Sequence, residues 1–153
     1  MEIEYLLSAD KVLGDFRASS KKQTLQTLSR KLAGSAGLDP RLVFDLLLAR
    51  EKLGSTGVGK GVAIPHARVP GLSDITGLFA RLTSPIDFDS VDAQPVDIVF
   101  MLLAPEDAGA DHLKALARVS RLLRDEATLK KLRMTSDNNA LYAMLAQPAS
   151  NVA

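Results

Sequence analysis

Residues 96–103 read Val-Asp-Ile-Val-Phe-Met-Leu-Leu, a nearly continuous apolar run whose first residues are largely β-branched. Such a run is typical of a central strand that is buried on both faces of a sheet. A strand of this kind needs cover on each face, which helices can supply. We therefore predict an α/β fold in a single domain, with a mixed β-sheet flanked by helices on both faces.

The segments on either side of this run supply the other elements. A second strand is expected over residues 75–83 and a short one over residues 62–64, closed by Pro65; a small strand near residues 5–7 is an open alternative. A capping-box pattern at Ser20 begins one helix, and Asp39-Pro40 begins another that ends by Gly54. Three more helices are expected over residues 111–124, 126–133 and 136–145. The domain then covers residues 1–146, followed by a flexible tail over residues 147–153.

Composition excludes several classes of protein. The formal net charge of the 153 residues is +1 and aromatic residues make up 5%, which argues against binding nucleic acid through its backbone or by base stacking. The absence of cysteine excludes disulfides, thiolate catalysis and zinc–thiolate sites. The N-terminus lacks the basic start of a signal peptide, and no apolar run would span a bilayer. We expect a cytoplasmic protein without membrane insertion.

A glycine-rich stretch over residues 54–61 nearly matches the phosphate-cradling pattern G-x-x-x-x-G-K-[ST]. Its last position is Gly61, which has no hydroxyl group to bind magnesium. A helix also precedes the stretch, and Pro65 follows soon after, whereas a P-loop follows a strand and opens a helix. A nucleotide-hydrolysing P-loop is therefore disfavoured. The stretch is either a flexible connector or a loop that shapes a site around the residues that follow it.

The chain has two histidines, and each has a local context that suits a functional site. His66 follows Pro65 and the glycine-rich stretch, which would let another protein approach closely. His112 is expected in the first turn of a helix, where unpaired N–H groups and the helix dipole favour an anion. There, Leu113, Leu116 and Ala117 would face the core. An ordinary surface or structural role stays open for each histidine.

Other charged residues fit simpler interpretations. Arg50 lies near the end of the second helix, where a cation complements the helix dipole. Asp87, Asp89 and Asp92 lack the spacing of a calcium loop and are interpreted as turn carboxylates. The arginines at positions 118, 121 and 124 are expected on a solvated helix face, with docking of an acidic partner as the alternative.

The segment from Arg50 to His66 strongly resembles the phosphorylation-site segment of fructose/mannitol-type enzyme IIA proteins of the bacterial phosphoenolpyruvate-dependent phosphotransferase system. The stretches at residues 84–88 and 94–97 also resemble that family, as does His112-Leu113 opening a helix after Leu103-Ala104-Pro105. The chain looks most similar to the nitrogen-regulatory branch. At Ala67-Arg68 it departs from many members, which have glycine and another residue.

The resemblance implies a cytoplasmic phosphotransferase component with a mixed sheet between helices. By motif, His66 is the phosphorylated residue, His112 the second active-site histidine and Arg50 the arginine that assists at the phosphoryl group. An HPr-like phosphocarrier protein would be the donor, and the scheme requires no cofactor and no metal. The output would be phosphorylation-dependent binding of regulatory target proteins. Alternatively, the phosphoryl group would pass to a permease subunit in sugar transport.

Overall fold

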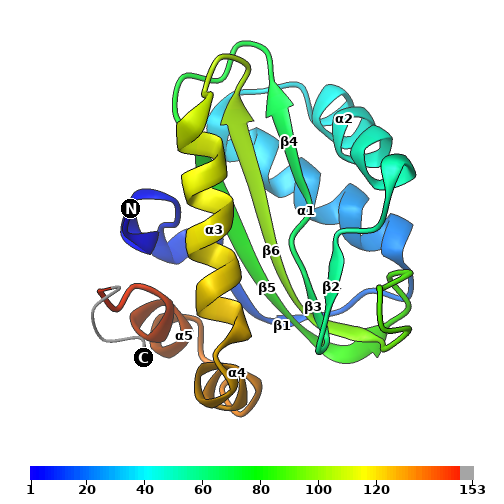
Figure 1. The fold of residues 1–153 in the computed structure, drawn as a ribbon, viewed down its shortest axis with the longest axis vertical. Coiled ribbons are helices and arrows are strands. Elements are labelled where there is room, and N and C mark those ends of the chain that lie inside the picture. Colours follow the sequence, from blue (N-terminus) through cyan, green and yellow to red (C-terminus); the bar gives the residue numbers. More distant parts are fainter. Residues whose placement is uncertain (149–153) are drawn as a thin grey trace.

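The computed structural model describes residues 1–148 of the chain, which form one α/β unit (Figure 1). Two short 3-10 helices, Ile3–Tyr5 and Ala9–Lys11, precede the first strand, β1 (Val12–Phe16). The remaining elements follow in chain order: α1 (Lys21–Ala36), α2 (Pro40–Leu53), β2 (Gly57–Gly59), β3 (Val62–Ala63), β4 (His66–Val69), β5 (Thr76–Ile86), β6 (Val96–Pro105), α3 (Ala110–Arg124), α4 (Glu126–Arg133) and α5 (Asn138–Leu145). The predicted tail begins within this part of the chain, but residues 149–153 lie outside the described residues.

The strands form one six-stranded mixed sheet with β6 at its centre. The order is β1-β5-β6-β3-β2, and β4 also pairs with β6. β6 is antiparallel to β5 and parallel to both β3 and β4. Nine of its ten residues are buried, since only Asp97 is partly exposed. The prediction of a central, doubly buried strand in a mixed sheet is confirmed.

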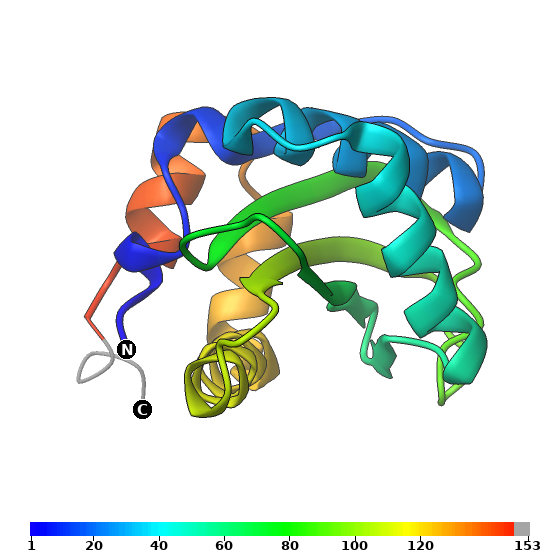
Figure 2. The same cartoon turned by 90° about the horizontal axis from the view of Figure 1, so that it is seen from above.

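Helices cover both faces of the sheet, as predicted. Figure 2 shows α1 and α2 on one face and α3 on the other. Side chains alternate along a strand, so β6 supplies two separate cores. Its residues on the α1 and α2 side are Val99, Met101 and Leu103, and those on the α3 side are Ile98, Phe100 and Leu102.

The caps of the first two helices agree with the sequence pattern. The Ser20 hydroxyl accepts from the Gln23 amide, and α1 ends at Gly37, whose φ of 69° is the left-handed conformation that favours glycine. The Gln23 side chain accepts from Ser19 rather than from the cap residue. The Asp39 carboxylate caps α2, with Pro40 as its first residue. α2 then ends at Leu53, directly before the glycine-rich stretch.

The N-terminal segment and the buried face of α3 differ from the sequence analysis. Residues 5–7 form no strand, because the chain there continues from a 3-10 helix and buries Leu6 and Leu7; the extra strand is β1. The buried face of α3 is also rotated from the expected one. His112 itself packs inward, so Leu113 (66% exposed) and Ala117 point outward, while Ala115, Val119 and Leu122 are buried.

Arg118 is not on a solvated face, in contrast to Arg121 and Arg124, which are exposed as expected. It lies on the buried side of α3, and its Nη2 donates to the Gln147 carbonyl at 3.3 Å. Burial lowers the pKa of this guanidinium, and the carboxylate of Glu2 opposes that shift. The three arginines therefore do not share one face of the helix. The buried face is wide enough to include Arg118, whereas Arg121 and Arg124 lie outside it.

Gly77 in β5 offers a direct test of the packing at the sheet centre. A Cβ atom there would lie 2.8 Å from Phe100 Cε1 and 3.1 Å from the Leu6 carbonyl oxygen. Gly77→Ala should therefore lower the free energy of unfolding by about 2 kcal/mol, because the buried ring cannot move aside without strain. Gly34→Ala, in open space on α1, is the matched control and should stabilise by up to about 1 kcal/mol. Urea denaturation measures both. Equal stabilities for the two variants would contradict this packing.

Candidate functional site

His66 is the first residue of β4, where the sequence predicted only the end of the preceding strand at Pro65. It lies beside Leu102, near the carboxyl end of β6. Its Nδ1 is 2.8 Å from the Ile64 carbonyl oxygen, an atom that can only accept a hydrogen bond. The neutral ring therefore carries its proton on Nδ1. The lone pair remains on Nε2, and the side chain is only partly buried.

His112 reaches the same place from the first turn of α3. The chain leaves β6 at Pro105 and begins α3 at Ala110, so the start of the helix lies close to the end of the sheet where His66 stands. The two imidazole centroids are 5.7 Å apart, with the rings inclined at 69°. His112 is buried, with 6% of its surface exposed, and its Nε2 has no hydrogen-bond partner within the described part of the chain.

Arg50 approaches from the last turn of α2. Its Nη1 donates to the Gly54 carbonyl oxygen at 2.8 Å, a contact that holds the long side chain along the end of the helix. Its positive charge is close enough to act on the pKa of His66. Arg50 of α2 and His112 of α3 thus gather around His66 of β4. The three residues singled out in the sequence form one group, although they come from three elements.

Arg68 is a fourth residue of this group, which the sequence marked only as a departure from the family pattern. Its Nε donates to Nδ1 of His112 at 3.2 Å. Arg68 and His66 are two residues apart in β4, so their side chains lie on the same face of the strand. The signal was present in His66-Ala67-Arg68-Val69, where polar and apolar residues alternate as in a half-buried strand.

Glu51 is a buried carboxylate that anchors the chain just before the histidine. It accepts from the Thr56 amide at 3.1 Å and from the Thr56 hydroxyl, and Lys21 Nζ lies 3.0 Å from its Oε1. Sequence reasoning missed it. The buried positions of α2 are Val43, Leu47 and Glu51, so a carboxylate continues an apolar stripe at four-residue spacing. A charged residue among the buried positions of a helix indicates that the folded chain supplies a hydrogen-bond or ion-pair partner for it.

The glycine-rich stretch forms a tight β-hairpin rather than a flexible connector. β2 and β3 pair antiparallel around Lys60, and Gly59 (φ 102°) and Gly61 (φ 78°) occupy conformations that favour glycine. The Lys60 amide donates to Asp92 Oδ2 at 2.9 Å, which gives that loop carboxylate a structural role. A strand, not a helix, follows Lys60, so the stretch lacks the geometry of a P-loop.

Both imidazoles are shifted towards the neutral form. Burial lowers the pKa of His66; the Ile64 carbonyl opposes this shift, the Arg50 cation adds to it, and the Glu51 carboxylate opposes it. Burial also lowers the pKa of His112, and the charges of His66 and Arg68 act in the same direction. A neutral imidazole is both a nucleophile at one nitrogen and a hydrogen-bond donor at the other.

Residues 1–148 contain no cluster of side chains with the composition of a metal site. No group of three or more histidine, cysteine or acidic side chains is placed there to hold a metal ion.

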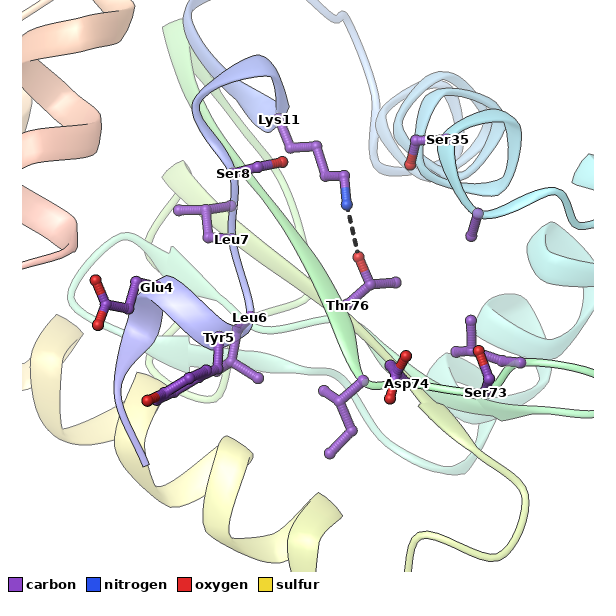
Figure 3. Close-up of a pocket in the computed structure, with 13 residues that line it drawn as sticks. Glu4, Tyr5, Leu6, Leu7, Ser8, Lys11, Ser35, Ser73, Asp74 and Thr76 are labelled. Atoms are coloured by element: carbon purple, nitrogen blue, oxygen red, sulfur yellow. Dashed lines mark hydrogen bonds between the residues drawn. The ribbon is translucent and has the colours of Figure 1, made fainter.

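A cavity of about 340 Å³ lies apart from the histidines, between the N-terminal segment, the end of α1 and the start of β5 (Figure 3). Within its lining, Lys11 Nζ donates to Thr76 Oγ1 at 2.9 Å. No helix in this part of the chain is both long and apolar enough to cross a membrane.

Curated relatives match the chain along most or all of its length. A nitrogen regulatory protein of Bradyrhizobium diazoefficiens is 56% identical over 153 residues, with all of both chains covered. One of Escherichia coli is 36% identical, covering 95% of this chain and 90% of its own. A fructose-specific EIIA component of the phosphotransferase system in Haloferax volcanii is 41% identical over 118 residues, covering 76% and 77%.

Solved structures agree with the fold. The nitrogen regulatory protein IIA-Ntr of Neisseria meningitidis superimposes with a TM-score of 0.87 at 37% identity, covering 93% of this chain and 97% of that one. The mannitol IIA of Escherichia coli gives a TM-score of 0.77 at 21% identity, covering 92% and 99%, and so supports the fold alone. A family model also matches residues 5–147, which include every element of the site. The chain therefore belongs to the EIIA 2 family of the phosphoenolpyruvate-dependent sugar phosphotransferase system.

Proposed function

We propose that the protein is a phosphoryl carrier that accepts a phosphoryl group on Nε2 of His66 from an HPr-like phosphocarrier protein. The observation that carries the proposal is the hydrogen bond between His66 Nδ1 and the Ile64 carbonyl. It commits one nitrogen to the backbone and leaves the other with a lone pair. Membership of a phosphotransferase family gives the proposal its chemical class.

The transfer exchanges one nitrogen–phosphorus bond for another. Nε2 of His66 forms a bond to phosphorus, while the bond from phosphorus to the donor's phosphohistidine nitrogen breaks and its electron pair returns to the donor ring. The negative charge lies mainly on the three equatorial oxygens in the transition state, so positioning and nearby positive groups supply most of the catalysis. The proton on His66 Nδ1 stays on that nitrogen throughout, hydrogen-bonded to the Ile64 carbonyl oxygen.

Two residues are proposed to stabilise the phosphoryl oxygens. His112 has a buried nitrogen, Nε2, that no described residue satisfies, and its ring lies beside that of His66. A donor that is already buried and oriented loses little in reorganisation when charge develops next to it. Arg50 adds a full positive charge at the end of α2, where its guanidinium retains N–H groups beyond the one bound to Gly54.

The proposed output is regulatory. Relatives that match most or all of the chain are named nitrogen regulatory proteins. A phosphoryl group on His66 would add about two negative charges to a region in which Leu113, next to His112 in sequence, is 66% exposed. Such a change can exchange one protein partner for another, because it makes an apolar contact surface anionic.

Sugar transport is the second candidate. A relative named as a fructose-specific EIIA component supports it, and a solved neighbour of the same fold is a mannitol enzyme IIA in complex with phosphorylated enzyme IIB. In that case His66 would pass its phosphoryl group to a permease subunit. Transfer of label from phosphorylated protein to a purified IIB domain would favour this candidate, whereas target capture that depends on the phosphorylation state would favour regulation.

The His66 assignment predicts a single acceptor. Incubation with a ³²P-labelled HPr-like carrier should place one acid-labile equivalent on the wild-type protein and none on His66→Ala. His66 is only partly buried, so the variant should stay folded, which circular dichroism can check. One equivalent of label on folded His66→Ala would refute the assignment.

The His112 assignment predicts a slower transfer with the same acceptor. His112→Ala should keep His66 as the labelled residue, while losing an oriented donor should slow transfer by roughly 100-fold. Rapid-mixing transfer assays measure the rate, and peptide mapping locates the label. An unchanged rate would leave His112 with a packing role only.

The pKa shifts predict how transfer depends on pH. A lowered pKa keeps His66 neutral at pH values where an ordinary histidine, with a pKa of about 6.5, is already protonated. Transfer should therefore persist as the pH falls below 6.5 and decline only at more acidic pH, as Nε2 gains a proton.

Arg50→Gln should raise the pKa of His66 by removing a neighbouring cation, and Arg41→Gln, at the opposite end of α2, is the control. NMR titration of the imidazole resonances decides the point; a higher pKa in wild type than in Arg50→Gln would contradict it.

A further inference from the structure

The contact between Arg68 and His112 joins two elements at the proposed site. Arg68 Nε lies 3.2 Å from His112 Nδ1, although 44 positions separate the two residues in sequence. Arg68 itself is exposed, and its backbone is held in β4 beside Ala104 of β6 whatever its side chain. An exposed side chain of this kind contributes little to a hydrophobic core, so any role of Arg68 at the site depends on its hydrogen bond to His112.

The chemistry of the two side chains fixes the direction of this bond. A guanidinium has five N–H donors and no acceptor, so Nδ1 of His112 must accept. An imidazole that accepts at Nδ1 and is neutral carries its proton on Nε2. That nitrogen is buried and unpartnered within residues 1–148.

We propose that Arg68 is a positioning residue that holds His112 in the Nε2–H tautomer and so keeps its buried N–H available to a phosphoryl oxygen. Only the claim that this N–H serves a phosphoryl oxygen rests on the proposed function of His66. The tautomer itself follows from the contact between the two side chains.

Without Arg68, nothing described at this site selects between the two neutral tautomers. No other hydrogen bond is made to either ring nitrogen of His112 among the described residues. In the opposite tautomer Nε2 would present a lone pair to an anionic phosphoryl group, which is repulsive where water is excluded. The side chain of Arg68 therefore acts on the transfer through His112, and it need not touch the reacting atoms.

The test replaces Arg68 and observes His112 directly. Arg68→Met keeps the length of the stem but has no donor, Arg68→Lys keeps a donor and the charge, and Arg41→Met is the matched control on an exposed arginine. Ring ¹⁵N chemical shifts of histidine-labelled protein report the tautomer above the pKa. We expect the Nε2–H form in wild type and control, a mixed population in Arg68→Met, and recovery in Arg68→Lys. Transfer should slow roughly tenfold in Arg68→Met, the size of one lost hydrogen bond.

Each outcome bears on the inference. It is overturned if wild-type His112 carries its proton on Nδ1, if Arg68→Met leaves the tautomer unchanged, or if the tautomer shifts while the transfer rate does not. Backbone amide spectra verify that each variant is folded. If wild-type protein takes no label on His66, the proposed function fails, whereas the ¹⁵N spectra still decide what Arg68 does to His112.

Discussion

The burial of β6 on both faces is the constraint on which the site depends. A strand with so few exposed atoms must pair on both edges and receive helices on both sides, and these requirements determine where its neighbours end. Parallel pairing with β4 sets His66 next to Leu102, near the carboxyl end of β6. The chain then turns after Pro105 and begins α3 over the same end, which brings His112 to His66. Two histidines that are 46 positions apart in sequence meet there because one strand is central.

The electrostatics around this end favour an incoming anion without charging the imidazoles. Burial lowers the pKa of both rings, and Arg50 and Arg68 supply fixed positive charge next to them. The buried carboxylate of Glu51 is matched by Lys21 and by the Thr56 amide and hydroxyl, which ties the hairpin to α1 and α2. The site thus places two imidazoles and two cations in one small region, with a buried nitrogen of His112 left unpartnered among the described residues. Under the proposed function, these groups would supply the positioning and the positive charge on which phosphoryl transfer depends.

Much of the fold could be predicted from periodicity, and much less of the site's detail. The apolar run of β6, the caps at Ser20 and Asp39 and the span of α4 were confirmed because each depends on local chemistry. β1 and β4 were missed since short strands are stabilised by pairing partners that are distant in sequence. The roles of Glu51 and Arg68 were missed for the same reason. Their meaning comes from Thr56, Lys21 and His112, which only the folded chain brings within hydrogen-bond distance.

The most direct test of the account is to identify the nitrogen that bonds to phosphorus. Protein with ¹⁵N-labelled imidazole rings, phosphorylated by an HPr-like carrier, can be examined for scalar coupling between ³¹P and ¹⁵N. The hydrogen bond from His66 Nδ1 to the Ile64 carbonyl predicts coupling to Nε2 of His66, with Nδ1 still protonated. Coupling to Nδ1 of His66, or to either nitrogen of His112, would contradict the central claim.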